Sequence, residues 1–308
     1  MQPLGIDKHD GATTGPIPDG LLRRLSAAMP LSPAAIWLPM AGGRTNRVWR
    51  LQDPEAESGP WIVKLYTADA ATPLFRNDPQ AELAILHNAS CRGLTPVPVM
   101  SGQTADGDFL VYRHVEGEPW QDGAECVART LRALHAMDDP PVMPLAPDGS
   151  AALVAQTLGM LATIKDPRGD DLRALQPGRP VPPSGLRRLL HGDPVPGNLI
   201  CPAGAGRQGP VLIDWQCPVL GDPVLDLAMF LSPAMQQIAR GKPLSMAETQ
   251  RFLTVYDDPD TVDRLHRLQA FLHWRMAAYC LWKITQPAPD PAYTTGLALE
   301  RAALVALG

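Results

Sequence analysis

Two short segments carry oxygen-bearing side chains that suit phosphoryl transfer. The first, His191-Gly-Asp-Pro-Val-Pro-Gly-Asn198, holds Asp193 and Asn198 in a stretch that its prolines and glycine keep from forming a regular helix. The second, Val211-Leu-Ile-Asp-Trp215, is typical of an apolar strand that ends at the carboxylate of Asp214. We therefore expect the three polar side chains to converge where a strand ends beside a loop.

The three residue types divide the chemistry between a metal and a base. Mg²⁺ is a hard cation that takes one or two carboxylate or amide oxygens together with substrate phosphates. Asn198 and Asp214 supply such a set, which leaves Asp193 for the hydroxyl of a phosphate acceptor. The alternative is structural: a loop followed by a strand that ends in a carboxylate without any catalytic role.

The spacing resembles that of the aminoglycoside phosphotransferase and choline/ethanolamine kinase superfamily. In those proteins the catalytic loop is His-Gly-Asp-x-x-x-x-Asn, and the metal-binding aspartate lies in an Ile-Asp-Trp/Phe/Tyr segment; both motifs are complete here. The resemblance implies an α+β, two-lobed protein-kinase-like fold, with a small N-terminal lobe built on an antiparallel sheet and a larger, mostly helical C-terminal lobe. It also implies ATP and Mg²⁺ as cofactors, Asp193 as the catalytic residue, and Asn198 and Asp214 as metal ligands.

A glycine-containing segment near the N-terminus is a candidate phosphate loop. In Pro39-Met-Ala-Gly-Gly-Arg-Thr-Asn-Arg-Val-Trp-Arg-Leu51, two glycines precede an alternating, strand-like stretch. Backbone N–H groups beside glycine can approach phosphate oxygens closely, so Gly42, Gly43 and Asn46 are candidates to line the nucleotide phosphates. An ordinary β-turn explains the pattern equally well. The segment resembles the Gly-Gly-x-Thr-Asn opening of the same superfamily.

A lysine and a glutamate follow in the order that the resemblance implies. Lys64 lies in the strand-like run Trp61-Ile-Val-Lys-Leu-Tyr66, where a buried ammonium group is costly unless it meets a negative charge. Glu82 lies in a segment, residues 79–87, whose apolar spacing is helical. In a kinase-like fold Lys64 would contact the nucleotide phosphates and Glu82 would hold Lys64. An edge-strand lysine and a solvated glutamate are the structural alternatives.

Three further residues are expected mainly to stabilise the structure around the site rather than to take part in the reaction. The run Leu220-Gly-Asp-Pro-Val-Leu-Asp-Leu-Ala228 resembles a superfamily motif in which Asp226 would open a helix and brace the catalytic loop. Asp222 either caps that helix or faces the substrate. His135, at the end of a predicted helix at residues 125–137, is expected to cap the helix or to line the edge of the core, and a catalytic role is the alternative.

Two aromatic residues near the C-terminus are candidates for substrate binding. The last predicted helix, residues 264–286, carries Tyr279 and Trp282 on neighbouring parts of one face. The segment resembles an aromatic-x-x-Trp-x-x-x-Gln pattern of choline and ethanolamine kinases, where aromatic rings help to enclose an ammonium group. Packing within the core is the alternative.

Length and composition indicate a globular protein of two parts. The 308 residues are 45% hydrophobic and 19% charged, enough to bury a sizeable core. We expect an N-terminal nucleotide-binding lobe over residues 1–115 and a C-terminal catalytic and substrate lobe over residues 116–308.

The net charge of −5 argues against nucleic acid or an anionic membrane as a partner. The five cysteines form no Cys-x-x-Cys pair, which indicates reduced thiols. With no secretory signal or membrane-spanning run in the sequence, we expect a cytoplasmic protein.

The sequence predicts the identity of the phosphate acceptor less directly than it predicts the phosphoryl-transfer reaction. The resemblance favours a small molecule with a hydroxyl group, and the Gly-Gly-x-Thr-Asn pattern with Tyr279 and Trp282 favours a choline-, ethanolamine- or thiamine-like amino alcohol. Aminoglycosides, sugars and homoserine are alternatives, because the loops that select them are separate from the catalytic motifs. A non-catalytic pseudokinase or nucleotide-binding module is the alternative of a different class.

Overall fold

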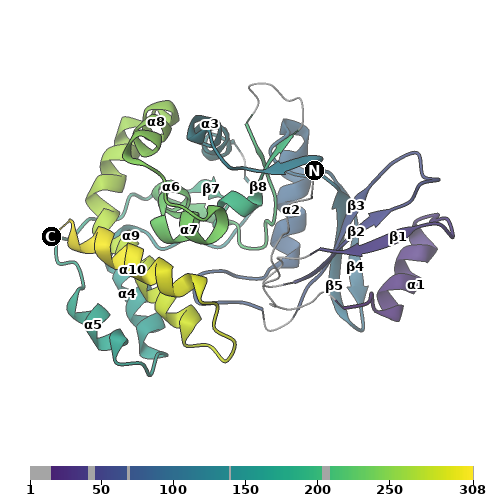
Figure 1. Cartoon of the computed structure of the whole chain (residues 1–308). Helices are drawn as coiled ribbons and strands as arrows, with labels where there is room; N and C mark the ends of the chain where they lie inside the picture. Colours follow the sequence, from purple (N-terminus) through teal and green to yellow (C-terminus); the bar gives the residue numbers. More distant parts are fainter. Residues whose placement is uncertain (1–14, 41–45, 68–69, 139, 203–208, 308) are drawn as a thin grey trace, which may run out of the picture.

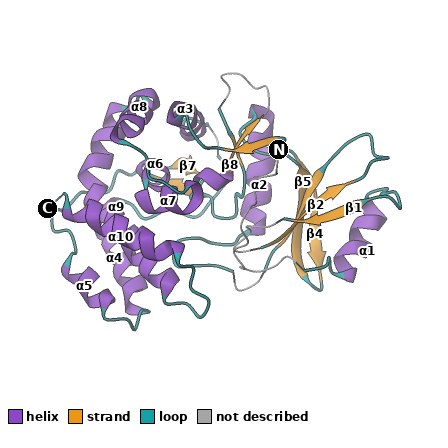
Figure 2. Cartoon of the chain, in the orientation of Figure 1, coloured by secondary structure: helices purple, strands orange, loops and turns teal. Residues whose placement is uncertain are grey.

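The chain folds into two lobes, and they are seen side by side in Figure 1. The computed structural model describes residues 15–40, 46–67, 70–138, 140–202 and 209–307. The smaller lobe contains the main sheet, and the larger lobe contains most of the helices (Figure 2). The two-lobed α+β architecture expected from the sequence is thereby confirmed.

One antiparallel sheet forms the centre of the smaller lobe. Its strands are β1 (Ile36–Pro39), β2 (Arg47–Gln52), β3 (Trp61–Leu65), β4 (Pro98–Thr104) and β5 (Gly107–Arg113). The spatial order is β1-β2-β3-β5-β4. Lys64 on β3 lies opposite Val48 on one side and Leu110 on the other. The lysine therefore occupies the middle of the sheet, and the edge-strand alternative is wrong.

Two helices cover the two faces of this sheet (Figure 1). Helix α1 (Asp19–Ala28) packs on the face that carries Trp61, Val63 and Leu65. Helix α2 (Pro79–Ala89) packs on the opposite face, against Ile62 and Tyr66. Successive strand residues point to opposite faces, so β3 is buried along its whole length and Lys64 is directed toward α2.

Helix α2 begins where the sequence specifies a helix start. Asp78 accepts hydrogen bonds from the backbone N–H groups of Gln80 and Ala81, and Pro79 occupies the first helical position. A short 3₁₀ helix, η1 (Ser90–Arg92), follows it. The start of α2 is thus fixed, which sets the position of Glu82 one turn later.

The larger lobe is built around a long central helix. Its helices are α3 (Ala124–His135), α4 (Gly149–Ala162), α5 (Arg168–Ala174), α6 (Val224–Leu231), α7 (Pro233–Arg240), α8 (Met246–Tyr256), α9 (Pro259–Ile284) and α10 (Ala292–Val305). Helix α9 packs against α4, α5, α6 and α10, so it is buried on several sides. No helix in the described part of the chain combines the length and apolar character needed to cross a bilayer.

Two small sheets bring the two motif segments to one place. Strands β7 (Arg188–Leu190) and β10 (Val219–Gly221) pair antiparallel, and β8 (Leu199–Pro202) pairs with both β6 (Gly117–Pro119) and β9 (Val211–Leu212). Residues 191–198 connect β7 to β8, and residues 213–218 connect β9 to β10. Leu190 lies opposite Val219, and Leu199 lies opposite Leu212. Both connections therefore emerge at the same end of the paired strands.

The main elements predicted from the sequence are present. Helices predicted at residues 79–87, 125–137 and 264–286 correspond to α2, α3 and α9. Strands predicted at residues 61–66 and 211–213 correspond to β3 and β9. The lobe limits at residues 115 and 116 stay a prediction.

Candidate active site

Lys64 lies between two carboxylates from distant parts of the chain. Its Nζ is 2.6 Å from Glu82 Oε2 and 2.5 Å from Asp214 Oδ1. Glu82 is 18 positions away in the sequence and Asp214 is 150 positions away. The Lys64 and Glu82 side chains are buried, whereas 37% of the Asp214 side chain is exposed. The lysine thus joins the smaller lobe to an accessible carboxylate of the larger lobe.

The charges of this cluster keep the lysine protonated. Burial alone would lower the pKa of Lys64, but the negative charges of Asp214 and Glu82 outweigh it and raise the pKa well above the ordinary lysine value. Burial raises the pKa of Glu82, and the neighbouring Lys64 charge opposes that rise. The Tyr66 hydroxyl also donates to Glu82 Oε2 at 2.6 Å. A charged ammonium group is therefore directed at Asp214.

Asp193 and Asn198 contact each other across a single 3₁₀ turn. Asn198 Nδ2 donates to the backbone oxygen of Asp193 at 2.9 Å and to its carboxylate Oδ2 at 3.2 Å. The turn, η2 (Pro196–Asn198), begins at a proline whose φ is fixed. The loop is free of regular α-helix, as expected, and the one 3₁₀ turn directs both side chains to one place.

His191 connects the two motif segments through its ring. Nδ1 accepts the backbone N–H of Asp193 at 3.2 Å, so the proton must be on Nε2, which donates to the Ile213 backbone oxygen at 3.0 Å. Burial lowers the pKa of His191, which agrees with this neutral tautomer. The ring thereby fixes the distance between the loop that carries Asp193 and the residue that precedes Asp214.

Asp226 braces the start of the same loop from the first turn of α6. Its Oδ2 accepts the backbone N–H of His191 at 2.8 Å, and its Oδ1 accepts that of Gly192 at 2.9 Å. His135 Nε2 lies 3.1 Å from the same carboxylate, and His135 Nδ1 is 2.8 Å from the Tyr256 hydroxyl. These residues are fully or almost fully buried. The structural roles predicted for Asp226 and His135 agree with these contacts.

Asp222 is also engaged within the protein. One of its carboxylate oxygens accepts the backbone N–H of Val224 at 3.2 Å, at the start of α6. The other forms a hydrogen-bonded ion pair with Arg264, and only 2% of Asp222 is exposed. Of the two roles considered from the sequence, these contacts match the capping role.

The geometry of Asn198 and Asp214 fits a hard cation. Asn198 lies just before β8 and Asp214 just after β9, and Ile213 N–H donates to the Asn198 backbone oxygen at 2.9 Å. Asp214 has φ of 61°, a left-handed conformation that non-glycine residues adopt rarely and often at functional sites. Among the described residues, no donor reaches the amide oxygen of Asn198 or the second carboxylate oxygen of Asp214. Both oxygens are thus free to serve as Mg²⁺ ligands beside phosphate and water.

Asn46 lies behind the cluster within a hydrogen-bond network. Its side-chain nitrogen donates to Gln216 Oε1 at 2.9 Å, and its oxygen accepts from Asn77 Nδ2 at 2.9 Å. Only 6% of Asn46 is exposed. The network connects the smaller lobe to the segment that follows Asp214. The other two predicted phosphate-binding residues, Gly42 and Gly43, lie outside the described residues.

The rings of Tyr279 and Trp282 are stacked on each other. Their centroids are 6.0 Å apart with an interplanar angle of 17°. Phe75 and Tyr293 pack against Tyr279 edge-on, with centroids at 5.2 and 6.0 Å. Tyr279 is 3% exposed, and Trp282 is half-buried. The structure thus brings the two predicted substrate residues together, in a cluster in which neighbouring rings cover much of Tyr279.

The cluster around Tyr279 nevertheless adjoins the catalytic loop. Val195 of that loop packs against the apolar cluster that contains Tyr279. Burial is the largest cause of the raised pKa of Tyr279, and the Tyr279 hydroxyl interacts with the Thr72 side chain. This end of α9 therefore lies beside the loop that carries Asp193.

Two lobes joined by a buried lysine–carboxylate cluster, with a His-Gly-Asp loop at the junction, define a small-molecule phosphotransferase of the kinase-like class. The sequence profile of the phosphotransferase enzyme family, APH, matches residues 36–271. The chain belongs to this family. A comparison with curated protein sequences finds no significant match.

Solved structures share the fold over nearly the whole chain. A choline/ethanolamine kinase family protein from Mesorhizobium loti superposes with a TM-score of 0.62 at 16% identity, covering 93% of each chain. An ethanolamine kinase from Plasmodium vivax gives 0.63 at 11% identity, covering 93% of this chain and 85% of its own. The ADP-bound aminoglycoside phosphotransferase APH(2'')-Ib gives 0.61 at 12% identity, covering 94% and 99%. These similarities establish the kinase-like fold.

Some residues of the site have no motif that marks them. Tyr66 is the last residue of a predicted strand, and only its contact with Glu82 shows that it supports the cluster. Gln216 follows Asp214-Trp215 and accepts from both Asn46 and the backbone N–H of Asp78. Tyr66 could have been found from its position, because it lies two residues after the buried Lys64 at the end of a predicted strand. Gln216 has no such signal.

Proposed function

We propose that this protein transfers the γ-phosphoryl group of ATP to a hydroxyl group of a small molecule. The observation that carries the proposal is the Lys64 ammonium group held by both Glu82 and Asp214, next to the loop that carries Asp193 and Asn198. Phosphoryl transfer depends mainly on positioning and on stabilising negative charge, and this set of groups supplies both.

Each residue has a separate role in the proposal. Asp193 accepts or orients the proton of the attacking hydroxyl. Lys64 positions the nucleotide phosphates, and Glu82 keeps it in place. Asn198 and Asp214 would hold Mg²⁺, which supplies positive charge to the phosphates when it is bound. Gly42, Gly43 and Asn46 remain the proposed surroundings of the phosphates.

The acceptor is a small alcohol. An amino alcohol of the choline, ethanolamine or thiamine type is the candidate from the sequence, and the packing of Val195 of the catalytic loop against the cluster that contains Tyr279 supports placing the acceptor at this end of α9. The packing of Phe75, Trp282 and Tyr293 around Tyr279 leaves little of that ring for an ammonium group. An aromatic cage therefore receives only partial support.

A coupled ADP-release assay over a panel of hydroxyl compounds tests the activity. Asp193→Asn is expected to lower kcat with the best acceptor by about 10²- to 10⁴-fold and to leave the affinity for MgATP nearly unchanged, because a general base acts in the transition state. Near-normal kcat in Asp193→Asn would remove this residue from the mechanism.

Asp263→Asn is the matched control for this substitution. Asp263 pairs with Arg267 on α9, and its side chain is 69% exposed, so loss of its charge should leave kcat unchanged. A protein that binds MgATP but releases no ADP with any acceptor of the panel would instead be a nucleotide-binding module without catalytic activity.

A further inference from the structure

A cavity beside the catalytic loop has a charge pattern that the catalytic motifs do not explain. It has a volume of about 290 Å³, which is at the small end for ligand sites. Gly192 of the catalytic loop and Cys217, just beyond Asp214, form one side of it. The segment at Thr72, before α2, and Gln156 on α4 form other parts of its wall. Its position suits the acceptor rather than the nucleotide.

The charged side chains that line this cavity among the described residues are two arginines, Arg76 and Arg275. No aspartate or glutamate of the described part of the chain lines it. Arg76 is exposed at its rim, and Arg275 on α9 is half-buried. A cationic acceptor would therefore meet like charge here, and an anionic one would meet opposite charge.

Arg275 is bound on one side only. Its Nε donates to Gln156 Oε1 at 2.7 Å, and within the described ranges its two terminal nitrogens contact no carboxylate and no other acceptor. Burial lowers the pKa of Arg275 to about 10, so the group is still charged at neutral pH. The guanidinium group is held by one hydrogen bond, and its two terminal NH₂ groups have the geometry for a bidentate interaction with a carboxylate or a phosphate.

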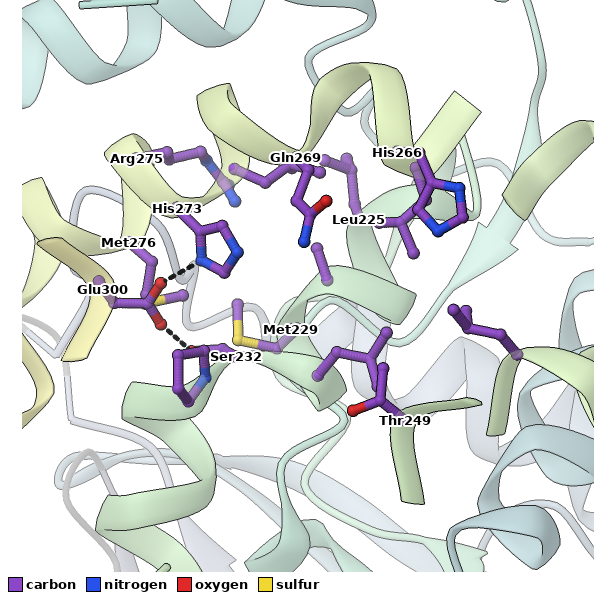
Figure 3. Close-up of a pocket in the computed structure, with 16 residues that line it drawn as sticks. Leu225, Met229, Ser232, Thr249, His266, Gln269, His273, Arg275, Met276 and Glu300 are labelled. Atoms are coloured by element: carbon purple, nitrogen blue, oxygen red, sulfur yellow. Dashed lines mark hydrogen bonds and ion pairs between the residues drawn. The ribbon is translucent and has the colours of Figure 1, made fainter. Parts of the chain in front are cut away.

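The carboxylate in a neighbouring cavity does not pair with Arg275. That cavity, of about 300 Å³, is mainly apolar and lies between α6, α8 and α9 (Figure 3). Glu300 lines it, as does Arg275, but the oxygens of Glu300 are occupied by His273, Ser232 and the backbone of Ala234. Glu300 thus connects α10 to α7 and α9, and it forms no ion pair with Arg275.

The helix geometry relates Arg275 to the reacting centre. Arg275 and Tyr279 are one turn apart on α9, so their side chains emerge about 6 Å apart on the same face. Thr72, which interacts with the Tyr279 hydroxyl, and Gly192, which directly precedes Asp193, both line the cavity. A small acceptor can therefore place a hydroxyl at Asp193 and a second group near Arg275.

From this arrangement we propose that the acceptor carries an anionic group, a carboxylate or a phosphate, which Arg275 binds while Asp193 receives the hydroxyl. The inference rests on the proposed kinase activity and names its substrate class. Gln156 orients Arg275, and Arg76 adds positive charge at the rim. The class differs from the amino alcohol favoured by the sequence, and the difference comes from the charges of this cavity.

Acceptors of matched length and different charge test the proposal. γ-Hydroxybutyrate, its primary amide and 4-aminobutan-1-ol differ in their terminal group, and 3-hydroxypropylphosphonate replaces the carboxylate by a phosphate-like anion. The kcat/KM of the better anion is expected to exceed that of the amide by roughly tenfold to a hundredfold, since hydrogen bonds to charged groups have this effect. The carboxylate and phosphonate members show which anion is bound. Equal or higher kcat/KM for the amide or the amine would overturn the proposal.

Arg275→Met and Arg275→Lys identify the residue responsible. Arg275→Met should reduce the anion-to-amide ratio of kcat/KM to about one, and Arg275→Lys should retain part of it because the charge remains without the paired N–H groups. Arg267→Met, on the same helix at a solvent-exposed position, should leave the ratio unchanged. A melting curve is recorded for each variant. If Arg275→Met does not fold, the anion-to-amide ratio of kcat/KM in Arg275→Lys still tests the assignment. An unchanged ratio in both Arg275 variants, or a raised KM for ATP alone, would contradict the assignment.

A binding measurement separates the two proposals. Calorimetry with γ-hydroxybutyrate and its amide, in the presence of a non-hydrolysable ATP analogue, does not require turnover. If no acceptor in the panel is phosphorylated, the kinase proposal fails for these compounds, yet anion binding that Arg275→Met abolishes would still support the anion site. Turnover of neutral or cationic compounds alone would keep the kinase proposal and refute the anion site, as would the absence of anion binding.

Discussion

Replacing Asp226 by asparagine tests whether this buried carboxylate holds the catalytic loop. Its two oxygens accept the backbone N–H groups of His191 and Gly192 and contact His135 Nε2. An asparagine has one oxygen and one amino group, so at least one of these buried donors loses its acceptor. Such a loss costs about 1–3 kcal/mol, and the other hydrogen bonds lose the assistance of a charge. We expect a total loss of about 2–4 kcal/mol in the free energy of unfolding.

The same substitution should reduce catalysis. A displacement of about 1 Å in a positioning element can lower the rate by about 10²-fold, and Asp193 follows the two braced amides directly. We expect kcat to fall by roughly 10- to 100-fold when it is measured well below the melting temperature. Hydrogen exchange at the backbone amides of His191 and Gly192 should also become faster. This measurement does not require knowledge of the phosphate acceptor.

Asp222→Asn is the matched control for Asp226→Asn. Asp222 is equally buried and lies just before the same helix, but it pairs with Arg264 and contacts no catalytic-loop amide among the described residues. It should lower the melting temperature without lowering kcat to the same extent. If both variants lost kcat equally, general destabilisation would explain the result. If Asp226→Asn were destabilised but fully active, the bracing role would be refuted.

Four further substitutions test other parts of the site. Asp214→Ala should abolish Mg²⁺-dependent ATP binding in calorimetry and Asn198→Ala should weaken it less, whereas unchanged affinity in Asp214→Ala would place the metal elsewhere. Because the pKa of His191 is lowered in the folded protein, the unfolded chain takes up this proton at a higher pH than the folded one. The free energy of unfolding should therefore fall as the pH drops below about 6.5. In a series of melting curves from pH 7.5 to 5.5, the melting temperature of His191→Gln should change less with pH than that of the unsubstituted protein. Trp282→Leu should lower the melting temperature and leave the ratio of kcat/KM for cationic and neutral alcohols unchanged; a selective rise in KM for the cation would instead support an ammonium cage of Tyr279 and Trp282.

The elements that carry the catalytic motifs could be predicted from the sequence because their patterns are local. The apolar run at Trp61 forms β3, and the capping residue Asp78 with Pro79 marks the start of α2. The prolines and glycine around Asp193 likewise exclude a regular α-helix. Proximity of Lys64 to Glu82 also followed, but only through resemblance to a family, since no local pattern joins a strand residue to a helix residue of another element.

The cavity that we propose for the acceptor could not be predicted, because its charges come from segments without a shared pattern. Arg275 lies on α9, whose sequence shows only helical periodicity, and Gln156 comes from α4. Whether an arginine on a helix faces solvent or a cavity depends on how the helices pack, and packing is not encoded in periodicity. The helices α5, α7, α8 and α10, which help to set this packing, also lacked the motifs used to identify the other elements.

The contacts between the lobes converge on the segment that contains Asp214. Its carboxylate binds Lys64, and the preceding Leu212 donates its N–H to the Leu94 backbone oxygen at 3.0 Å. Gln216 accepts the N–H of Asp78 at 2.9 Å through its backbone oxygen. Because this same segment supplies a proposed metal ligand, a change in how the lobes meet must also move that ligand. If MgATP binds at Lys64 and Asp214 as proposed, its binding and the relative position of the lobes would be coupled through residues 212–216.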